Sequence, residues 1–476
     1  MNALDTMLAL LLVLVAPVVG SVGSLALGGP GAERLARGAS IAAWIGASLL
    51  LAGAASGQWG AYFGIDVVSD VFLFLVASVY ALATWYSRTY LEHVHAPFLT
   101  PQRYYALLGA FVFAMLFTLS VSDLGLMWIG VEGTTIASAL LIVLERKPTS
   151  VEAAWRYTLI ASAGLAIALF ALLLIYGSTG TLNAFALAQH PVPATLPIAF
   201  AVSLALVGYG TKVGLFPMHT WLPDAHSEAP SPVSALFSGV LLPTALYAFL
   251  RVEAIVAAPV PPALSTLVIV FGLATAVVAA LLLQRQRSYK RLFAYSSMEV
   301  MGLAVVGIGL GGIALYGALI LVVAHGFAKA AAFFCSGNVL RKTGTTRIDE
   351  LRDLRHRLPW TGGTWVISAI AATGAPPFGT FVGELLILSG AFVIGAYWVA
   401  GIAIGAIAIS FLGVNWQVGR MVFGGGRRPQ PTLEDPARSL AVPWISLAMA
   451  LALGIASVPY LAPAIHAAAT ALGGGP

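Results

Sequence analysis

Six ionisable side chains stand inside apolar segments of the sequence, where a charge is expensive. They are carboxylic acids, lysines and one histidine: Glu132, Lys212, Glu299, His325, Lys329 and Glu384. A charged residue at the centre of a bilayer costs about 2.5–3.5 kcal/mol on insertion scales. Burial disfavours the charged form of lysine and of carboxylate alike, so neighbouring groups of the two kinds can exchange protons. The chemistry predicted is proton transfer along a buried relay.

The alternative is a set of structural ion pairs: Glu132 with Lys212, and Glu299 or Glu384 with Lys329. Buried pairs rarely stabilise a fold more than well-packed apolar residues do, so structure alone is a weak reason for several of them. His325, which by itself could equally be a packing residue, stands four positions before Lys329. That spacing is about one helical turn, so both side chains point the same way and a shared function is favoured.

Two of these charges stand beside helix-breaking prolines. Lys212 comes shortly before Pro217, and Pro376 and Pro377 come shortly before Glu384. Proline interrupts a helix, and the freed backbone groups survive in a membrane only against protein or a water-filled cavity. Two interrupted helices in corresponding positions, each beside a charge, match the repeat pattern of membrane transporters. An ordinary proline kink is the alternative at either site.

The composition assigns the chain to a bilayer. Of its 476 residues, 59% are hydrophobic and 9% are charged, whereas soluble chains carry about 25% charged residues. The 50 glycines suit closely packed membrane helices. One cysteine, Cys335, cannot build a disulfide framework, a zinc site or an iron–sulfur ligand set. We therefore expect no cofactor on this chain, and any electron carrier on another.

Apolar runs of about 20 residues, enough to cross a bilayer, define the elements that position these charges. We predict fourteen helices over 7–27, 38–55, 67–86, 104–121, 124–144, 157–176, 194–216, 232–250, 263–284, 292–310, 313–340, 361–388 (interrupted), 395–420 and 439–458. Asp5 is the only early charge, so we predict a retained first span, with the N-terminus outside the cytoplasm, rather than a secretory signal. The predicted fold class is an all-α polytopic membrane protein.

Positive charge tests this arrangement independently. With the N-terminus outside, the cytoplasmic loops hold 21 of the 24 Lys and Arg residues, the last of these loops with Arg420, Arg427, Arg428 and Arg438. Only Arg251 lies on the opposite side, and the two remaining lysines lie within spans. The net charge of +5 therefore reflects topology and gives no indication of nucleic acid.

Five segments resemble one family. Residues 212–242, KVGLFPMHTWLPDAHSEAPSPVSALFSGVLL, closely resemble the signature of the antiporter-like membrane subunits of respiratory complex I, Mrp-type cation/proton antiporters and group 4 hydrogenases. MWIGVEGTT, KRLFAYSSMEVMG, HGFAKAAAFFCSGNVL and GAPPFGTFVGELLIL extend the resemblance from about helix 4 to helix 13. The wording looks most like the F-type subunit of hydrogenase-4 and formate hydrogenlyase-like complexes.

The resemblance implies two inverted five-helix repeats, with helices 7 and 12 discontinuous. One membrane domain, 1–476, would then contain helices 1–3 (1–90), a first repeat (104–256), a second repeat (263–425) and a last helix with its tail (439–476). On the family's pattern, Glu132 is the helix-5 glutamate that pairs with the helix-7 lysine, Lys212. Lys329 matches a helix-11 lysine of the central axis, and Glu384 matches the helix-12 residue that passes protons to the far side.

The centre of the implied relay departs from the family. Pro243 stands where relatives carry a helix-8 lysine or histidine, and Val300 stands where a histidine often occurs. The central link then uses water, or Glu299, Lys329 and His325.

Three polar residues of the signature, His219, Asp224 and His226, are expected in a cytoplasmic loop after helix 7. Their functional interpretation is a polar loop that admits protons and gates helix 7. Helix capping and loop hydrogen bonding are the alternative.

The resemblance implies a proton-translocating subunit of a redox-driven complex, hydrogenase-4-like or complex I-like, in a bacterial or archaeal cytoplasmic membrane. Its partners would be the other membrane subunits of that assembly, the lipid bilayer and protons, with sodium as the alternative ion. A second hypothesis is an Mrp-type cation/proton antiporter subunit, or the proton-conducting partner of an inorganic-carbon transporter. A third is a scaffold whose charges only pair.

Overall fold

The computed structural model describes residues 3–92, 94, 97–256, 260–425, 434, 440–455 and 460–473. The first half contains α1 (Ala3–Ala26), α2 (Gly29–Ala52), β1 (Gly57–Trp59), β2 (Phe63–Ile65), α3 (Val67–Leu91), α4 (Pro101–Ser120), α5 (Leu124–Ile142), α6 (Pro148–Thr179), α7 (Ala184–Gln189), α8 (Leu196–Val213), η1 (Met218–Thr220), α9 (Trp221–Glu228), α10 (Ser231–Leu236), η2 (Phe237–Leu241) and α11 (Leu242–Glu253). The second half contains α12 (Pro262–Leu283), α13 (Tyr289–Leu310), α14 (Gly312–Thr343), η3 (Ile348–Glu350), α15 (Leu354–Arg357), α16 (Pro359–Ala372), α17 (Gly379–Val393), α18 (Tyr397–Phe423), α20 (Ala441–Ile455) and α21 (Leu461–Ala471).

Within these residues, twelve helical segments are long and apolar enough to cross a membrane. The interrupted pair α16 and α17 and the shorter α20 account for the two further predicted spans, so the all-α membrane fold is confirmed. The sequence did not predict the small antiparallel hairpin β1–β2, the short helix α7 or the terminal helix α21. These elements are too short for hydropathy to separate them from loops.

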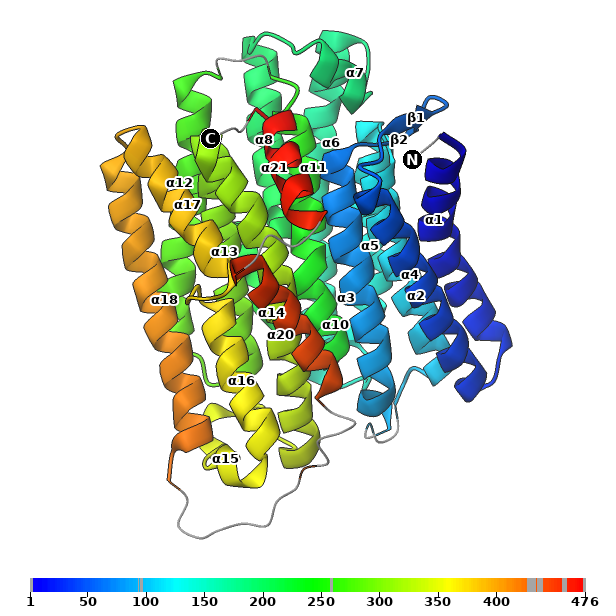
Figure 1. Cartoon of the computed structure of the whole chain (residues 1–476), viewed down its shortest axis with the longest axis vertical. Coiled ribbons are helices and arrows are strands. Elements are labelled where there is room, and N and C mark those ends of the chain that lie inside the picture. The colour runs from blue at the N-terminus through cyan, green and yellow to red at the C-terminus, as the bar shows by residue number, and fades with distance from the viewer. Residues whose placement is uncertain are drawn as a thin grey trace.

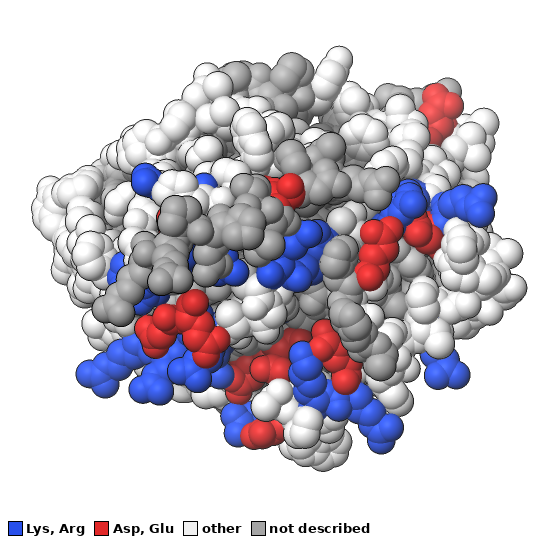
Figure 2. Space-filling view, turned by 90° about the horizontal axis from the view of Figure 1, so that it is seen from below, with Lys and Arg blue, Asp and Glu red and all other residues white. Residues whose placement is uncertain are grey.

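The helices stand roughly side by side in one bundle (Figure 1). The β1–β2 hairpin and α7 lie at one end of it, near the N-terminus, and α15 lies at the other. Seen from the α15 end, the surface is rich in Lys, Arg, Asp and Glu (Figure 2). We call this the charged face. Three residues of the last basic loop, Arg427, Arg428 and Arg438, lie outside the described residues.

Small residues let the helices approach closely, as the glycine content indicated. Between α12 and α13, a Cβ on Gly272 would lie only 2.7 Å from the carbonyl oxygen of Gly302. The span from Ser231 to Glu253, formed by α10, η2 and α11, is buried within the bundle. Its five-residue π-helical turn, Phe237–Leu241, directly precedes α11, which contains Pro243. Proline has no backbone N–H, so the regular i to i−4 hydrogen-bond pattern of an α-helix is interrupted at this point.

Candidate functional site

The break in helix 7 follows Lys212 directly. Helix α8 ends at Val213, and Gly214 adopts a left-handed conformation (φ 87°) that an L side chain would strain. The freed backbone groups find partners inside the protein: Phe216 N donates to Thr275 Oγ1 at 3.0 Å, and Trp221 Nε1 donates to the Thr211 carbonyl at 2.7 Å. The predicted interruption at Pro217, the residue before η1, is therefore confirmed.

The placement of His219, Asp224 and His226 in a cytoplasmic loop was wrong. His219 lies in η1 and the other two lie in α9, so all three belong to the second half of the broken helix. His226 is fully buried and His219 nearly so. The polar and proline-rich sequence suggested a loop. Pro223, however, lies in the first turn of α9, where the backbone N–H that proline lacks has no partner within the helix.

Lys212 is held by hydroxyl groups. Its Nζ donates to Thr135 Oγ1 at 2.7 Å and to the Tyr157 hydroxyl at 2.6 Å, and it lies 4.5 Å from the centre of the Tyr157 ring. The Tyr157 hydroxyl in turn lies 2.8 Å from Ser138 Oγ. A buried ammonium is thus linked to groups that both donate and accept protons.

The expected direct pair between Glu132 and Lys212 is not among the ion pairs of the described residues, although the charge of Glu132 acts on Lys212. Glu132 is half-buried on α5, and its Oε1 accepts from Ser162 Oγ at 2.6 Å. Its other oxygen, Oε2, is buried and has no partner within the described part of the chain. A structural ion pair therefore does not explain why these two groups are buried.

Helices α13 and α14 bring together three of the predicted residues. Lys329 Nζ donates to Ser296 Oγ at 2.7 Å and to the Phe293 carbonyl at 3.1 Å. Glu299 and Lys329 are both buried, and each acts electrostatically on the other. His325 is fully buried, and neither ring nitrogen has a hydrogen-bond partner among the residues that the structure describes.

The second break seats Glu384. Helix α16 ends at Ala372, Pro376 and Pro377 follow, and α17 begins at Gly379, so the predicted interruption of helix 12 is confirmed. Glu384 is buried beside this break, and its charge and that of Glu299 act on each other. A Cβ on Gly374 (φ 73°) would lie 1.9 Å from Glu384 Oε2, so the absence of a side chain there makes room for the carboxylate.

We predict that Gly374→Ala displaces the Glu384 carboxylate and slows any proton movement that depends on it. Gly395→Ala is the matched control, because Gly395 has a similar φ of 74° but nothing within 4 Å of an added Cβ. Both variants should lose about 1 kcal/mol of stability from backbone strain. Only Gly374→Ala should reduce proton transport in vesicles by more than its loss of folded protein accounts for. Equal transport rates in the two variants would contradict the prediction.

The sequence analysis missed a partly buried ion pair at the end of the bundle that carries α7. Arg251, at the end of α11, donates to Asp66 Oδ1 and Oδ2 at 2.5 and 2.7 Å and to Ser69 Oγ at 3.1 Å. Burial would raise the pKa of Asp66, but the Arg251 guanidinium holds it below its ordinary value. The signal was present, because Arg251 is the one basic residue predicted on that side.

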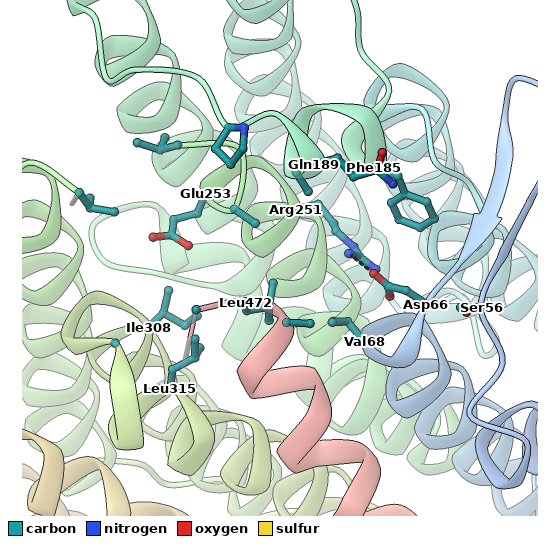
Figure 3. A pocket seen from close by; sticks show the side chains of 18 of the residues that line it. Ser56, Asp66, Val68, Phe185, Gln189, Arg251, Glu253, Ile308, Leu315 and Leu472 are labelled. Carbon is teal, nitrogen blue, oxygen red and sulfur yellow. Dashed lines mark hydrogen bonds and ion pairs between the residues drawn. The ribbon is translucent and has the colours of Figure 1, made fainter. Parts of the chain in front are cut away.

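This pair lines a pocket of about 900 Å³ at the end that carries α7 (Figure 3). Glu253 lies on one wall and the Arg251–Asp66 pair on another, with Leu472 at the end of α21 between them. One turn after Asp66, the fully buried Asp70 has no hydrogen-bond partner for either carboxylate oxygen among the described residues. Within the described chain, no three His, Cys, Asp or Glu side chains lie together so as to hold a metal ion.

Comparison with known proteins places this arrangement in a family. Residues 121–410 match the family described as NADH:quinone oxidoreductase/Mrp antiporter, TM. The chain is 35% identical over 405 residues to a Hydrogenase-4 component F homolog of Methylacidiphilum infernorum, covering 81% of this chain and 83% of that protein. It is 30% identical over 414 residues to NADH-quinone oxidoreductase subunit N of Desulforudis audaxviator, covering 84% and 81%.

Solved structures show the same fold. The membrane-bound sulfane sulfur reductase, an archaeal respiratory membrane complex, contains a chain that matches with a TM-score of 0.87 at 22% identity, over 98% of this chain and 97% of that one. Respiratory complex I from Thermus thermophilus contains a chain that matches with a TM-score of 0.83 at 24% identity, over 98% of this chain and 100% of that one. With its buried lysines and glutamates beside two broken helices, the chain belongs to the NADH:quinone oxidoreductase/Mrp antiporter family, as an antiporter-like multi-pass membrane subunit.

Proposed function

We propose that this chain moves protons across a bacterial or archaeal cytoplasmic membrane as a subunit of a redox-driven complex of the hydrogenase-4 or complex I type. The N-terminus would lie outside the cytoplasm and the charged face inside. The observation that carries the proposal is the burial of Lys212 and Glu384, each beside a helix break, with Lys329 and Glu299 buried elsewhere in the same bundle. The 35% identity to a hydrogenase-4 component F homolog supports this type of complex.

In this proposal Lys212 receives the proton, and Glu132 controls how tightly Lys212 holds it. A negative Glu132 favours the ammonium form, and neutralising Glu132 releases the proton, because the two groups interact through their charges. Thr135 and Tyr157 are suited to the transfer, since their hydroxyl groups can donate to the neutral amine as readily as they accept from the ammonium.

The second half of the relay would then run through Lys329 and Glu299, with His325 beside them, to Glu384. The charge of Lys329 acts on Glu299, and the charges of Glu299 and Glu384 act on each other. A proton that arrives at one of these groups therefore alters the proton affinity of the next. Residues 104–256 and 263–425 would be the two repeats, between 1–90 and 439–476.

The residues around the two breaks would gate this relay: Pro217, His219, Asp224, His226, Pro376 and Pro377. Asp224 accepts from Arg156 on α6 at 3.0 Å and also pairs with Arg291 on α13. It thereby ties the second half of the broken helix to α6 and α13, which would belong to different repeats. A shift of α9 would break or strain these ion pairs, so the position of α9 and the opening of the proton path would be coupled.

The test is redox-driven transport by the complex isolated through a tag on this chain and reconstituted into sealed vesicles. We expect a pH-sensitive dye to report proton movement in sodium-free buffer, and a protonophore to abolish it. A requirement for sodium, with transport that survives the protonophore, would contradict the proposal. Copurification of a [NiFe]-type large subunit and an iron–sulfur chain would support it. Small Mrp-type proteins or a large zinc-binding partner would support the antiporter or inorganic-carbon alternative.

A further inference from the structure

A second polar pocket, of about 320 Å³, lies where several helices end near the charged face. Its lining includes Lys147, Thr149, Glu228, Lys290 and Thr346. Lys147 is 62% exposed, so the pocket opens to solvent there. Lys290 is only 1% exposed, so the same pocket also reaches a buried lysine.

Lys290, in the first turn of α13, does not owe its burial to an ion pair. Its Nζ donates to the carbonyl of Ala229, which joins α9 to α10 just before Pro230. Glu145 and Glu228 line the same pocket, yet neither forms an ion pair with Lys290 in the described part of the chain. A buried ammonium without an ion pair, beside a pocket that has room for several waters, is placed to exchange protons rather than to stabilise the fold.

His226 offers the next acceptor inward. Its Nδ1 lies 2.8 Å from the Leu222 carbonyl, and because a carbonyl only accepts, Nδ1 must carry the hydrogen. In the neutral ring, Nε2 is then a bare acceptor, and it is buried without a partner among the described residues. The rings of Trp221, Phe237 and Phe333 pack around the His226 ring.

Lys290 and His226 meet at one turn of the chain. Ser234 Oγ lies 2.7 Å from the His226 carbonyl and 3.2 Å from the Ala229 carbonyl, which also accepts from Lys290 Nζ. The His226 ring also packs against Phe333, one helical turn after Lys329 on α14, with 6.1 Å between the ring centres. His226 therefore lies between the pocket and the second half of the proposed relay.

We propose that Lys290 is the group through which protons enter the chain from the charged face, and that it passes them through water to His226 Nε2. The inference rests on the proposed proton transport. The Lys290 ammonium loses a proton, the Nε2 lone pair gains it, and the neutral amine takes up a replacement proton that arrives from bulk solvent, as hydronium, through the water of the pocket. His226 returns to its neutral form by giving the proton onward to the relay.

The test replaces Lys290 with arginine in the reconstituted complex. Arginine keeps the positive charge and a donor for the Ala229 carbonyl but does not release its proton. We expect assembly and redox activity to be retained and proton transport to fall to the passive leak, whereas the exposed Lys147→Arg keeps full transport. A merely structural Lys290 would tolerate arginine, so normal transport by Lys290→Arg would overturn the inference.

Lys212→Met, measured in parallel, separates this inference from the function itself. If Lys212→Met stops transport and Lys290→Arg does not, only the uptake site is wrong. If neither variant affects transport, the proposed function fails as well.

Cysteine labelling provides a second measurement that does not alter Lys290. The only natural cysteine of this chain, Cys335, is fully buried, so within this chain an introduced cysteine is modified selectively, and the complex without it gives the background from partner subunits. A cationic methanethiosulfonate reagent on Thr346→Cys, in the pocket wall, should block proton uptake. The control is Ser265→Cys, which lines the larger pocket at the α7 end. Full labelling of Thr346→Cys with unchanged transport would also overturn the inference.

Discussion

Lys212→Met is expected to reduce proton transport to the passive leak while the partner subunits' redox chemistry continues in part. Lys212 is fully buried, and within the described part of the chain its ammonium donates to the hydroxyl groups of Thr135 and Tyr157, which are far weaker bases than an amine. Carrying a charge through the span without such a group costs about 3 kcal/mol, which corresponds to a fall of roughly 100-fold in rate. The measurement is proton movement per electron transferred in sealed vesicles.

The matched control for this variant is Lys342→Met, which removes a half-buried lysine at the end of α14, outside both pockets, and should leave transport unchanged. The double variant Glu132→Gln with Lys212→Met distinguishes a relay from a scaffold. It removes both charges together, so a scaffold whose charges only pair would recover coupled activity. A relay would remain inactive, and recovery would therefore refute the role given to Lys212.

Lys329→Met should cause a loss of similar size in the second half of the relay. Lys329 is fully buried, and its charge acts on the buried Glu299. Without it, Glu299 has lost the positive group that makes its ionised form accessible, and proton transfer toward Glu384 stops. Proton transport per electron should again fall to the leak, in a complex that still assembles.

Two comparisons make this second prediction specific. Lys342→Met removes a half-buried lysine from the last turn of the same helix, α14, and should transport normally. Glu299→Gln should match Lys329→Met in its loss of transport, because the two groups act as a unit. Normal transport by Lys329→Met would mean that protons bypass α14.

The sequence predicted the membrane spans and the two breaks because these depend on local chemistry. Apolar length decides which segments enter a bilayer, and Pro217, Pro376 and Pro377 each lack the backbone donor that a helix interior needs. The cost of burying a charge identifies Lys212, Lys329 and the other ionisable residues of apolar segments as functional candidates from the sequence alone. The resemblance to the antiporter-like family, carried by the signature after Lys212, was confirmed by the family match over residues 121–410.

The sequence did not predict the hydrogen-bond and ion-pair partners of these residues, because periodicity relates residues along one helix and not between helices. The hydroxyl groups that hold Lys212 come from positions 135 and 157, and the structure puts them, rather than Glu132, against its ammonium. The same limit hid the Arg251–Asp66 pair, whose members are 185 positions apart.

Local sequence composition gave a wrong secondary-structure prediction where tertiary packing overrides it. The prolines and polar residues around His226 and Asp224 predicted a loop. The segment is instead the helix α9, because it is packed among other helices of the bundle. The sequence by itself therefore identified most of the buried groups of the proposed relay and located both backbone interruptions, but it did not identify the burial of Asp70, His226 or Lys290. Only the packing of distant helices decided which groups contact Lys212, since its hydrogen bonds of 2.6–2.7 Å depend on how whole helices are placed.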